Sequence, residues 1–454
     1  MKYQCILDDV PNYTAFLTVD ELRASAHRLV ETHPEHVRLM PIGKSRRGEP
    51  MEALVIGNGL HKALLFAMPH PNEPIGSMTL EYLSWRLAED AALIEELGYI
   101  WYMVKCIDPD GTRLNEGWFK GPYTLEHYAR NYYRPPAFQQ IEWTFPVDYK
   151  TLHFHNPLPE TRALMHLMEQ VSPDLLYSLH NSGFGGVYFY VSGGNPRFYQ
   201  ELHDLVAGEE LPLHLGEPEM PFIKPYAPAI FPEVSVQDIY DYYAANNPTD
   251  PAVIMRQGAS SFDYLRGLGT GFSIVCEMPY FYNPKIVDTN PSDIIRRDAI
   301  LQSVARDREY DAFHRRQFEA VADLLTAPSP FVETIQEWLR IFPESAAALE
   351  NWARNDPQTA RPGTVAEVFD SLVVGKFYRL FTLGLLLRAF THQMAVGGEH
   401  PRLRRAYEEV EVEFERQSAE VTRELDYHVI PIRKLVRVQL GAGLLAAELA
   451  REMV

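Results

Sequence analysis

The segment KALLFAMPHPNEP, residues 62–74, contains the pattern from which the fold and the site can be predicted. An uninterrupted apolar run ends at Met68, and a short loop follows in which His70 and Glu73 lie three residues apart. A run of this length and composition is typical of a strand buried on both faces of a sheet. We therefore expect His70 and Glu73 at the carboxyl end of a central strand, where open α/β sheets bind their ligands.

Two later segments repeat this arrangement. LLYSLH (175–180) is an apolar run that ends in His180, and FSIVCE (272–277) ends in Glu277. Two histidines and a glutamate form a known ligand set for catalytic zinc, which leaves one position for water. A second carboxylate is needed to accept the proton of that water and to pass it on. We predict that His70, Glu73 and His180 bind the metal and that Glu277 is the general base and acid.

The pattern of the whole chain predicts two parts. Strand-like runs at 37–42, 51–56, 64–68 and 99–107 alternate with segments of helical period, which predicts a mixed, mostly parallel sheet flanked by helices. Thr18 with Glu21 is typical of a capped helix start, for a helix over 18–33. After about residue 284 the strand signals stop, and helical periods recur at 294–325, 332–341, 365–394, 402–425 and 432–453. We predict an α/β catalytic domain at 1–290 and an all-helical extension at 291–454.

The composition of the chain excludes some classes of binding partner. The 454-residue chain has a formal net charge of −19, which argues against nucleic acid and anionic membranes as main partners. The amino terminus lacks the features of a secretory signal, and no apolar stretch is long enough to span a membrane. Three cysteines give no paired disulfide framework. We expect a reduced, cytoplasmic protein, in which the helical extension packs, lines a substrate channel or mediates self-association.

The ordered motifs of the chain resemble those of the zinc carboxypeptidases of the A and B type. The resemblance extends over roughly residues 13–284 and rests on segments that follow one another in the family's order and spacing: LMPIGKSRRGEP (39–50), HPNE (70–73), DPDG (108–111), PETRA (159–163), PDLLYSLH (173–180) and GFSIVCE (271–277). It implies a mixed α/β fold, one zinc ion per chain, and hydrolysis of a C-terminal peptide or peptide-like amide bond. The zinc ligands would be His70, Glu73 and His180, and the base Glu277.

The resemblance also implies a second catalytic residue, Arg113, and residues that bind the substrate. Arg113 lies near the position of the family arginine that stabilises the oxyanion. Arg130 and Asn131 are the nearest match to the pair that binds the terminal carboxylate, with Arg134 as a rival. Phe262 and Tyr264 fall in the stretch that lines the side-chain pocket, and Phe262 stands where members specific for basic side chains carry an acid.

Three interpretations of the function stay open at this point, and the carboxypeptidase is the first. Aspartoacylase and succinylglutamate desuccinylase have a similar zinc site, so an amidohydrolase acting on N-acyl amino acids is the second candidate. A non-catalytic scaffold is the third, although all four predicted site residues are present. Separately, His153 and His155 alternate along the chain and would share one face of an extended strand, so a second metal site is conceivable.

Overall fold

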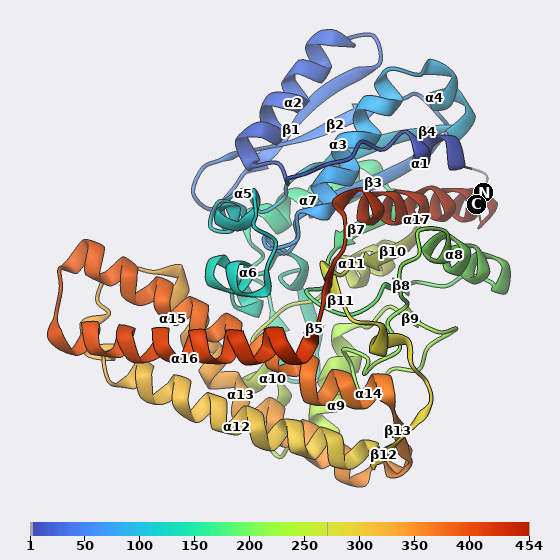
Figure 1. Ribbon diagram of the computed structural model, residues 1–454. Helices are drawn as coiled ribbons and strands as arrows, with labels where there is room; N and C mark the ends of the chain where they lie inside the picture. Colours follow the sequence, from blue (N-terminus) through green and yellow to red (C-terminus); the bar gives the residue numbers. More distant parts are fainter. Residues whose placement is uncertain (1–2, 270, 454) are drawn as a thin grey trace.

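The computed structural model describes residues 3–269 and 271–453 (Figure 1). Its centre is an eight-stranded sheet with the order β1-β2-β4-β3-β7-β10-β8-β9. The strands of this sheet are β1 (Val37–Lys44), β2 (Pro50–Ile56), β3 (His61–Ala67), β4 (Tyr99–Val104), β7 (Leu175–His180), β8 (Tyr188–Val191), β9 (Ile230–Pro232) and β10 (Phe272–Glu277). The predicted mixed, mostly parallel sheet is confirmed.

The middle of the sheet is parallel. β3 pairs in parallel with β4 and β7, and β7 pairs in parallel with β10. In this register Ala67 lies opposite Leu179, and His180 lies opposite Glu277. The carboxyl ends of β3, β7 and β10 therefore meet at one edge of the sheet. Antiparallel pairs, β1 with β2, β2 with β4, and β8 with β10, extend the sheet on both sides.

Helices cover both faces of the sheet. Leu65 and Tyr177 point to one face, where they join a core formed with α2, α3, α8 and α17. Leu64 and Phe66 point to the other face, where they join a core that includes α7, α9 and α11. These helices are α2 (Val19–Thr32), α3 (Ile75–Ala88), α7 (Pro159–Val171), α8 (Pro196–Gly208), α9 (Val236–Asn246), α11 (Ser261–Leu268) and α17 (Ile432–Met453). Burial on both faces explains why the central strands read as uninterrupted apolar runs.

Shorter elements connect this framework. They are α1 (Gln4–Asp8), α4 (Ala91–Leu97), α5 (Pro109–Arg113), α6 (Leu125–Asn131), α10 (Pro251–Met255) and a separate hairpin of β5 (Val147–Tyr149) and β6 (Leu152–Phe154). The capping box predicted for α2 is confirmed, because the Thr18 side chain accepts from the Glu21 amide and the Glu21 side chain accepts from the Thr18 amide.

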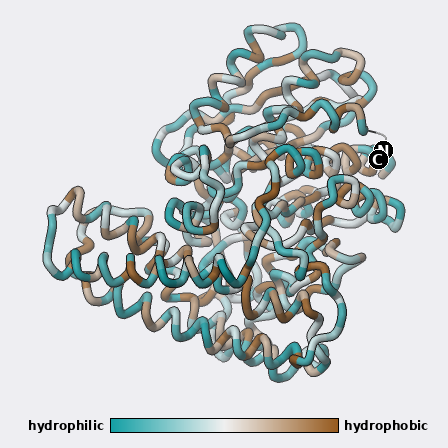
Figure 2. The backbone as a smooth tube through the Cα atoms, in the orientation of Figure 1, coloured by the Kyte–Doolittle hydropathy of each residue, from teal (hydrophilic) through white to brown (hydrophobic). Residues whose placement is uncertain are grey.

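The carboxyl-terminal part is mainly helical. It contains α12 (Arg296–Glu319), α13 (Pro330–Asn355), α14 (Val365–Phe369), α15 (Gly375–Gly397) and α16 (Pro401–Leu425), with a π-helical turn at Asp370–Val374. Hydrophilic residues predominate along α12 and α16, and hydrophobic residues recur at intervals within each helix (Figure 2). None of the described helices combines the length and the hydrophobicity needed to cross a membrane. The expected absence of strands after residue 284 is wrong, since β12 (Pro291–Ile295), β13 (Pro362–Thr364) and β14 (His428–Val429) are short strands.

The last helix, α17, returns to the sheet. The chain leaves the α/β part after β11 (Phe281–Tyr282) and comes back at β14, which pairs antiparallel with β11. The helix then packs against the sheet, where the Tyr177 hydroxyl donates to the carbonyl of Gln439 across 2.9 Å. The predicted division at residues 290 and 291 stays a prediction. The position of α17 is a reason to count it with the α/β part and to treat 283–427 as a helical insertion.

Candidate metal centre

The polar residues of the predicted site lie at the carboxyl edge of the parallel strands. His70 and Glu73 occupy the loop between β3 and α3, and a bond from the Glu73 amide to the His70 carbonyl, 3.1 Å long, makes the loop a tight turn. Met68 has a left-handed backbone conformation, with φ at 57°, at the point where the chain leaves β3. His180 is the last residue of β7, and Glu277 is the last residue of β10. Sheet register therefore holds both side chains at the loop that carries His70 and Glu73.

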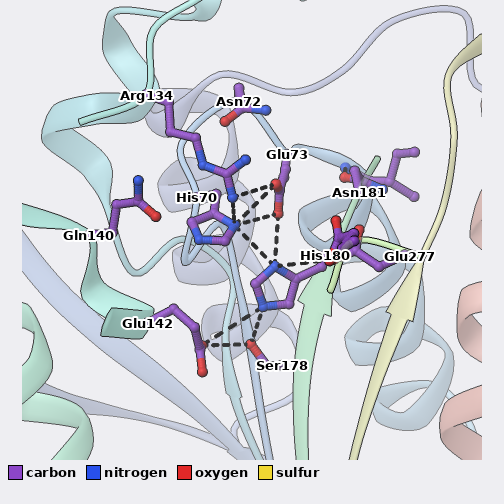
Figure 3. Close-up of polar contacts among 12 residues, drawn as sticks. His70, Asn72, Glu73, Arg134, Gln140, Glu142, Ser178, His180, Asn181 and Glu277 are labelled. Atoms are coloured by element: carbon purple, nitrogen blue, oxygen red, sulfur yellow. Dashed lines mark hydrogen bonds and ion pairs between the residues drawn. The ribbon is translucent and has the colours of Figure 1, made fainter. Parts of the chain in front are cut away.

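Three potential ligands converge (Figure 3). The Nδ1 atoms of His70 and His180 are 3.2 Å apart, and Glu73 Oε2 lies 3.0 Å from Nδ1 of His180 and 3.2 Å from Nδ1 of His70. All three side chains are buried. Two imidazole nitrogens and a carboxylate within 4.8 Å of one another form a group that could hold a metal ion. The structure thus brings together the three residues predicted as metal ligands.

A hydrogen-bonded chain orients the ring of His180. Its Nε2 lies 2.8 Å from Ser178 Oγ and 3.8 Å from Glu142 Oε2, while Ser178 Oγ donates to Glu142 across 3.0 Å. Glu142 also accepts from the amide and the hydroxyl of Ser261. These bonds place a ring proton on Nε2 and direct Nδ1 to the centre of the cluster. A carboxylate that faces the outer nitrogen of the ring, as Glu142 does, is a common partner of metal-binding histidines.

The electrostatics of the cluster follow from burial and from this arrangement. Burial, helped by the charge of Arg134, lowers the pKa of His70 to about 4, which keeps that ring neutral. Burial opposes a proton on His180, but Glu142 and Glu73 raise its pKa well above the ordinary value. Burial also opposes ionisation of Glu73, yet His70 and Arg134 hold its pKa well below the usual range. A carboxylate beside a neutral imidazole is a donor set that suits a divalent cation.

Arg134 lies beside the cluster and lines the cavity. Its Nη2 is 3.3 Å from Glu73 Oε1 and makes a short contact with His70 Nδ1. A guanidinium has no acceptor, so it donates to Nδ1, and the proton of the His70 ring is therefore on Nε2. That Nε2 atom is buried and has no protein partner within the described part of the chain. The position of Arg134 shows that this corner of the cluster accommodates positive charge.

Glu277 is next to the three ligands without being part of their contacts. Its Oε1 lies 3.9 Å from His180 Nδ1. Burial raises the pKa of Glu277 well above its ordinary value, and Glu73 adds to the rise while His180 opposes it. The side chain is therefore placed beside the group that could bind a metal and in an environment that stabilises its protonated form.

Arg113, predicted as catalytic, and Arg130 and Asn131, predicted to bind the substrate, lie away from the cluster. Arg113 forms ion pairs with Asp20 and Glu49 at the surface of α5 and is not part of the cluster. Arg130 donates from Nη1 to both carboxylate oxygens of Glu411 of α16 and lies over the ring of Phe414. The Asn131 side chain caps its own helix by donating to the carbonyl of His127. Each side chain thus has a partner outside the cluster. For Arg113 and Arg130 the partner comes from a segment far away in the chain, which sequence spacing alone does not show.

The two predicted pocket residues differ from each other. Phe262 lines the cavity that contains the cluster. Tyr264, two residues further along α11, instead donates to Glu169 across 2.5 Å and packs against Phe145. Helical geometry explains the difference, because residues two positions apart on a helix point in different directions.

The cavity above the cluster has a volume of about 730 Å³. The α/β part contributes the metal cluster, Phe262 and the hydroxyl-bearing Tyr188 and Tyr190, and the insertion contributes a wall. That wall consists of Trp338 of α13, Asp370 of the π-helical turn, and Tyr378, Arg379, Phe381 and Thr382 of α15. A cavity of this size, with a few polar groups among aromatic walls, is typical of a binding site for a small molecule or a short peptide.

Sequence reasoning missed Glu142 and underrated Arg134. Glu142 sits in a 3-10 turn of the irregular stretch 116–158, and nothing in its neighbours marks it as a partner of a histidine that follows 38 residues later (180 − 142). Arg134 was only a rival for the carboxylate. The one signal for both is that a long irregular segment inside a compact domain is often functional.

Fold and site together define a candidate metal-dependent hydrolase built at the edge of an α/β sheet. Comparison with known families agrees, because residues 22–209 match the family model described as zinc carboxypeptidase. This match covers less than half of the 454-residue chain. No curated protein matches the chain.

Solved structures of metallocarboxypeptidases are also similar to the chain. Carboxypeptidase A from Helicoverpa armigera is 16% identical, with 59% of this chain and 66% of that one covered and a TM-score of 0.39. The metallo-carboxypeptidase from Burkholderia cenocepacia is 16% identical, with 58% of this chain and 60% of that one covered and a TM-score of 0.33. The metallo-carboxypeptidase from Pseudomonas aeruginosa is 18% identical, with 57% of this chain and 60% of that one covered and a TM-score of 0.32. The matched region is less than two thirds of each of these proteins, and likeness at this level does not establish a shared activity.

Proposed function

We propose that this protein is a zinc-dependent carboxypeptidase, which hydrolyses a C-terminal peptide or peptide-like amide bond. The single observation that supports this most strongly is the convergence of His70, Glu73 and His180 with Glu277 beside them. The zinc carboxypeptidase match over residues 22–209 supports the same reaction class.

The residues present fit a zinc ion. The Nδ1 atoms of two imidazoles and a buried carboxylate face one point, and the guanidinium of Arg134 beside them is a positive charge at this place. Zinc in such a ligand set supplies a strong nucleophile near neutral pH and polarises a carbonyl group. One ion per chain is expected at this site.

The remaining chemistry belongs to side chains of the protein. Glu277 lies where it would accept the proton of the attacking water and then deliver it to the leaving amine. Arg134, and not Arg113, has the position to donate hydrogen bonds to the charge that develops on the carbonyl oxygen. Glu142 and Ser178 hold His180 in one orientation, so the site is organised before the substrate arrives.

One observation keeps the amidohydrolase alternative in play. Arg130 and Asn131, the pair expected to bind the terminal carboxylate of a peptide, are engaged by Glu411 and by the carbonyl of His127. An enzyme that removes an acyl group from an amino acid would use the same metal cluster and the same base. The two activities therefore differ in substrate recognition and not in chemistry.

The cavity also has carboxylates that lack a cationic partner. Glu233 accepts from Ser273 Oγ across 2.8 Å, and Glu219 accepts from the hydroxyls of Tyr188 and Tyr190 across 2.7 and 3.0 Å. Within the described residues neither carboxylate has a lysine or arginine within ion-pair distance. Burial raises the pKa of Glu233 well above its ordinary value. A positive group on the substrate would favour the ionised form of Glu233 and would pair with its charge. We therefore expect a preference for substrates with a cationic side chain, although Phe262 carries no charge.

The variant Glu277→Gln tests the proposed mechanism. It should bind zinc with unchanged stoichiometry, measured by elemental analysis, and lose turnover by a factor of at least about 100, the size expected for removal of a general base. Glu169→Gln, a change in a surface carboxylate of α7, is the control and should keep its activity. Full activity in Glu277→Gln would remove Glu277 from the mechanism.

Substrate assays separate the two candidate activities. Blocked dipeptides with a free C-terminal carboxylate and N-acyl amino acids are offered to the same preparation. Hydrolysis of the dipeptides supports the carboxypeptidase, and hydrolysis of only the N-acyl amino acids supports the amidohydrolase. If a preparation loaded with zinc hydrolyses neither class, the proposal of amide hydrolysis is contradicted.

A further inference from the structure

A second cluster of metal-binding side chains lies on the hairpin formed by β5 and β6. Asp148 of β5 is directly opposite His153 of β6 in the antiparallel register, and His155 follows two residues after His153. Directly opposed residues in an antiparallel pair place their side chains on the same face, and positions i and i+2 share that face. The hairpin therefore gathers two imidazoles and a carboxylate on one side.

The contacts within the cluster are short and share one atom. Asp148 Oδ1 lies 2.7 Å from His153 Nδ1 and 3.0 Å from His155 Nε2. The three candidate ligand atoms all lie within 4.8 Å of one another. Each ring donates to the same carboxylate oxygen, so both nitrogens already point toward a single place. A metal ion bound at that place would replace the two ring protons.

The backbone of the hairpin is held firmly by its neighbours. Val147 and Leu152 are buried in the core beneath it. At the turn, Tyr149 donates to Asp241 of α9 across 2.9 Å, and Thr151 donates to Asp250, the N-cap of α10, across 2.6 Å. The three ligand side chains themselves remain about 60% exposed, at 60%, 63% and 60% for His153, Asp148 and His155. The scaffold is thus ordered while water has access to the ligands.

We propose that Asp148, His153 and His155 form a second metal site, separate from the buried cluster at the edge of the sheet. Two imidazoles and one carboxylate are a donor set for zinc and for other first-row transition ions that prefer nitrogen, and water would complete the coordination. No lysine or arginine forms an ion pair with Asp148 in the described part of the chain, so the carboxylate charge is available to a cation. Exposure predicts weaker binding here than at the buried cluster.

Zinc titration of the metal-free, full-length protein tests the proposal. Isothermal calorimetry and elemental analysis should give two zinc ions per chain. His153→Asn and, independently, Asp148→Asn should each lose one ion and keep hydrolytic activity, while His70→Asn should lose the other ion and the activity. His166→Asn, a change in an exposed histidine of α7 outside both clusters, should keep two ions.

Cobalt provides a second readout that does not depend on activity. The His70→Asn variant loaded with Co²⁺ should still show the visible absorption of a cobalt site with nitrogen ligands, and His153→Asn added to it should abolish that absorption. A single zinc ion in the wild-type chain, lost with His70→Asn, would overturn the second site. Two ions retained in both His153→Asn and Asp148→Asn would overturn the ligand assignment.

Discussion

Gln439, in the middle of α17, donates from Nε2 to the backbone carbonyl of His180 across 2.9 Å. The same side chain accepts from Thr79 Oγ1 of α3 across 2.9 Å and is completely buried. The last helix of the chain is thereby bonded to the strand end that carries a predicted metal ligand. This bond links a segment more than 250 residues away to the position of the site.

Gln439→Leu should destabilise the protein and weaken its metal binding. The change leaves the hydroxyl of Thr79 and the carbonyl of His180 without this partner in a buried environment, which costs about 2–3 kcal/mol. Urea unfolding measures the stability, and zinc titration measures the affinity. Gln393→Leu is the matched control, because Gln393 is also buried but accepts from the Ala327 amide in the insertion. It should lower stability while leaving zinc affinity unchanged; equal zinc affinity in both variants would contradict the link to His180.

Glu142→Gln should reduce zinc affinity by a factor of about 10 to 100, the usual effect of removing a carboxylate that orients a metal-binding histidine. Glu142 accepts a hydrogen bond from the hydroxyl of Ser178 and faces Nε2 of His180. Competition with a zinc chelator measures the affinity. Glu160→Gln changes another buried carboxylate, one that binds Arg46 away from the site, and controls for general effects of lost charge. Unaltered affinity in Glu142→Gln would show that the contact is not functional.

Glu233→Gln should shift the substrate preference of the enzyme. If Glu233 favours a positive side chain, the ratio of kcat/KM for lysine- or arginine-containing substrates over their neutral counterparts should fall at least about tenfold, equivalent to about 1.4 kcal/mol. The neutral substrates should be turned over as before. Glu169→Gln is the control for a surface charge. An unchanged ratio would exclude Glu233 as a specificity residue.

His314 should make the stability of the protein depend on pH. It is buried in α12 beside Phe313; burial, with the charge of Arg379, lowers its pKa to about 3, although Glu413 acts in the opposite direction. Because the folded pKa is depressed below the unfolded value of about 6.5, the neutral ring contributes stability that is fully present above pH 6.5. This contribution is lost as the pH falls toward 3, by up to about 1.4 kcal/mol per pH unit.

Urea unfolding at several pH values between 7.5 and 5 measures this effect. In the wild type, His314 takes up about one proton when the protein unfolds at low pH. The His314→Gln variant lacks this proton uptake, so its free energy of unfolding should fall less steeply with decreasing pH. His27→Gln, a change in an exposed histidine paired with Glu52, should follow the wild-type curve. Identical slopes for wild type and His314→Gln would mean that His314 does not titrate between the folded and unfolded states.

Strand ends were the most informative part of the sequence. His70, Glu73, His180 and Glu277 could be grouped because each follows or ends an apolar run, and parallel pairing brings such ends to one edge. The substrate residues could not be grouped in the same way. Arg113, Arg130 and Asn131 lie on short helices in irregular segments, where a side chain is directed by whichever partner packs against it. The partner of Arg130 is Glu411, which is 281 residues away.

The sequence by itself determined the class of fold, the capped start of α2 and the four residues at the strand ends, because these depend on local periodicity and on rules of sheet pairing. Only the tertiary structure placed Arg134 and Glu142 at the cluster, returned α17 to the sheet, and made α13 and α15 a wall of the cavity. The physical reason is that these relationships are contacts between segments far apart along the chain. Such contacts are selected by packing and charge compensation in the folded state, and they leave no periodic signal in the residues that make them.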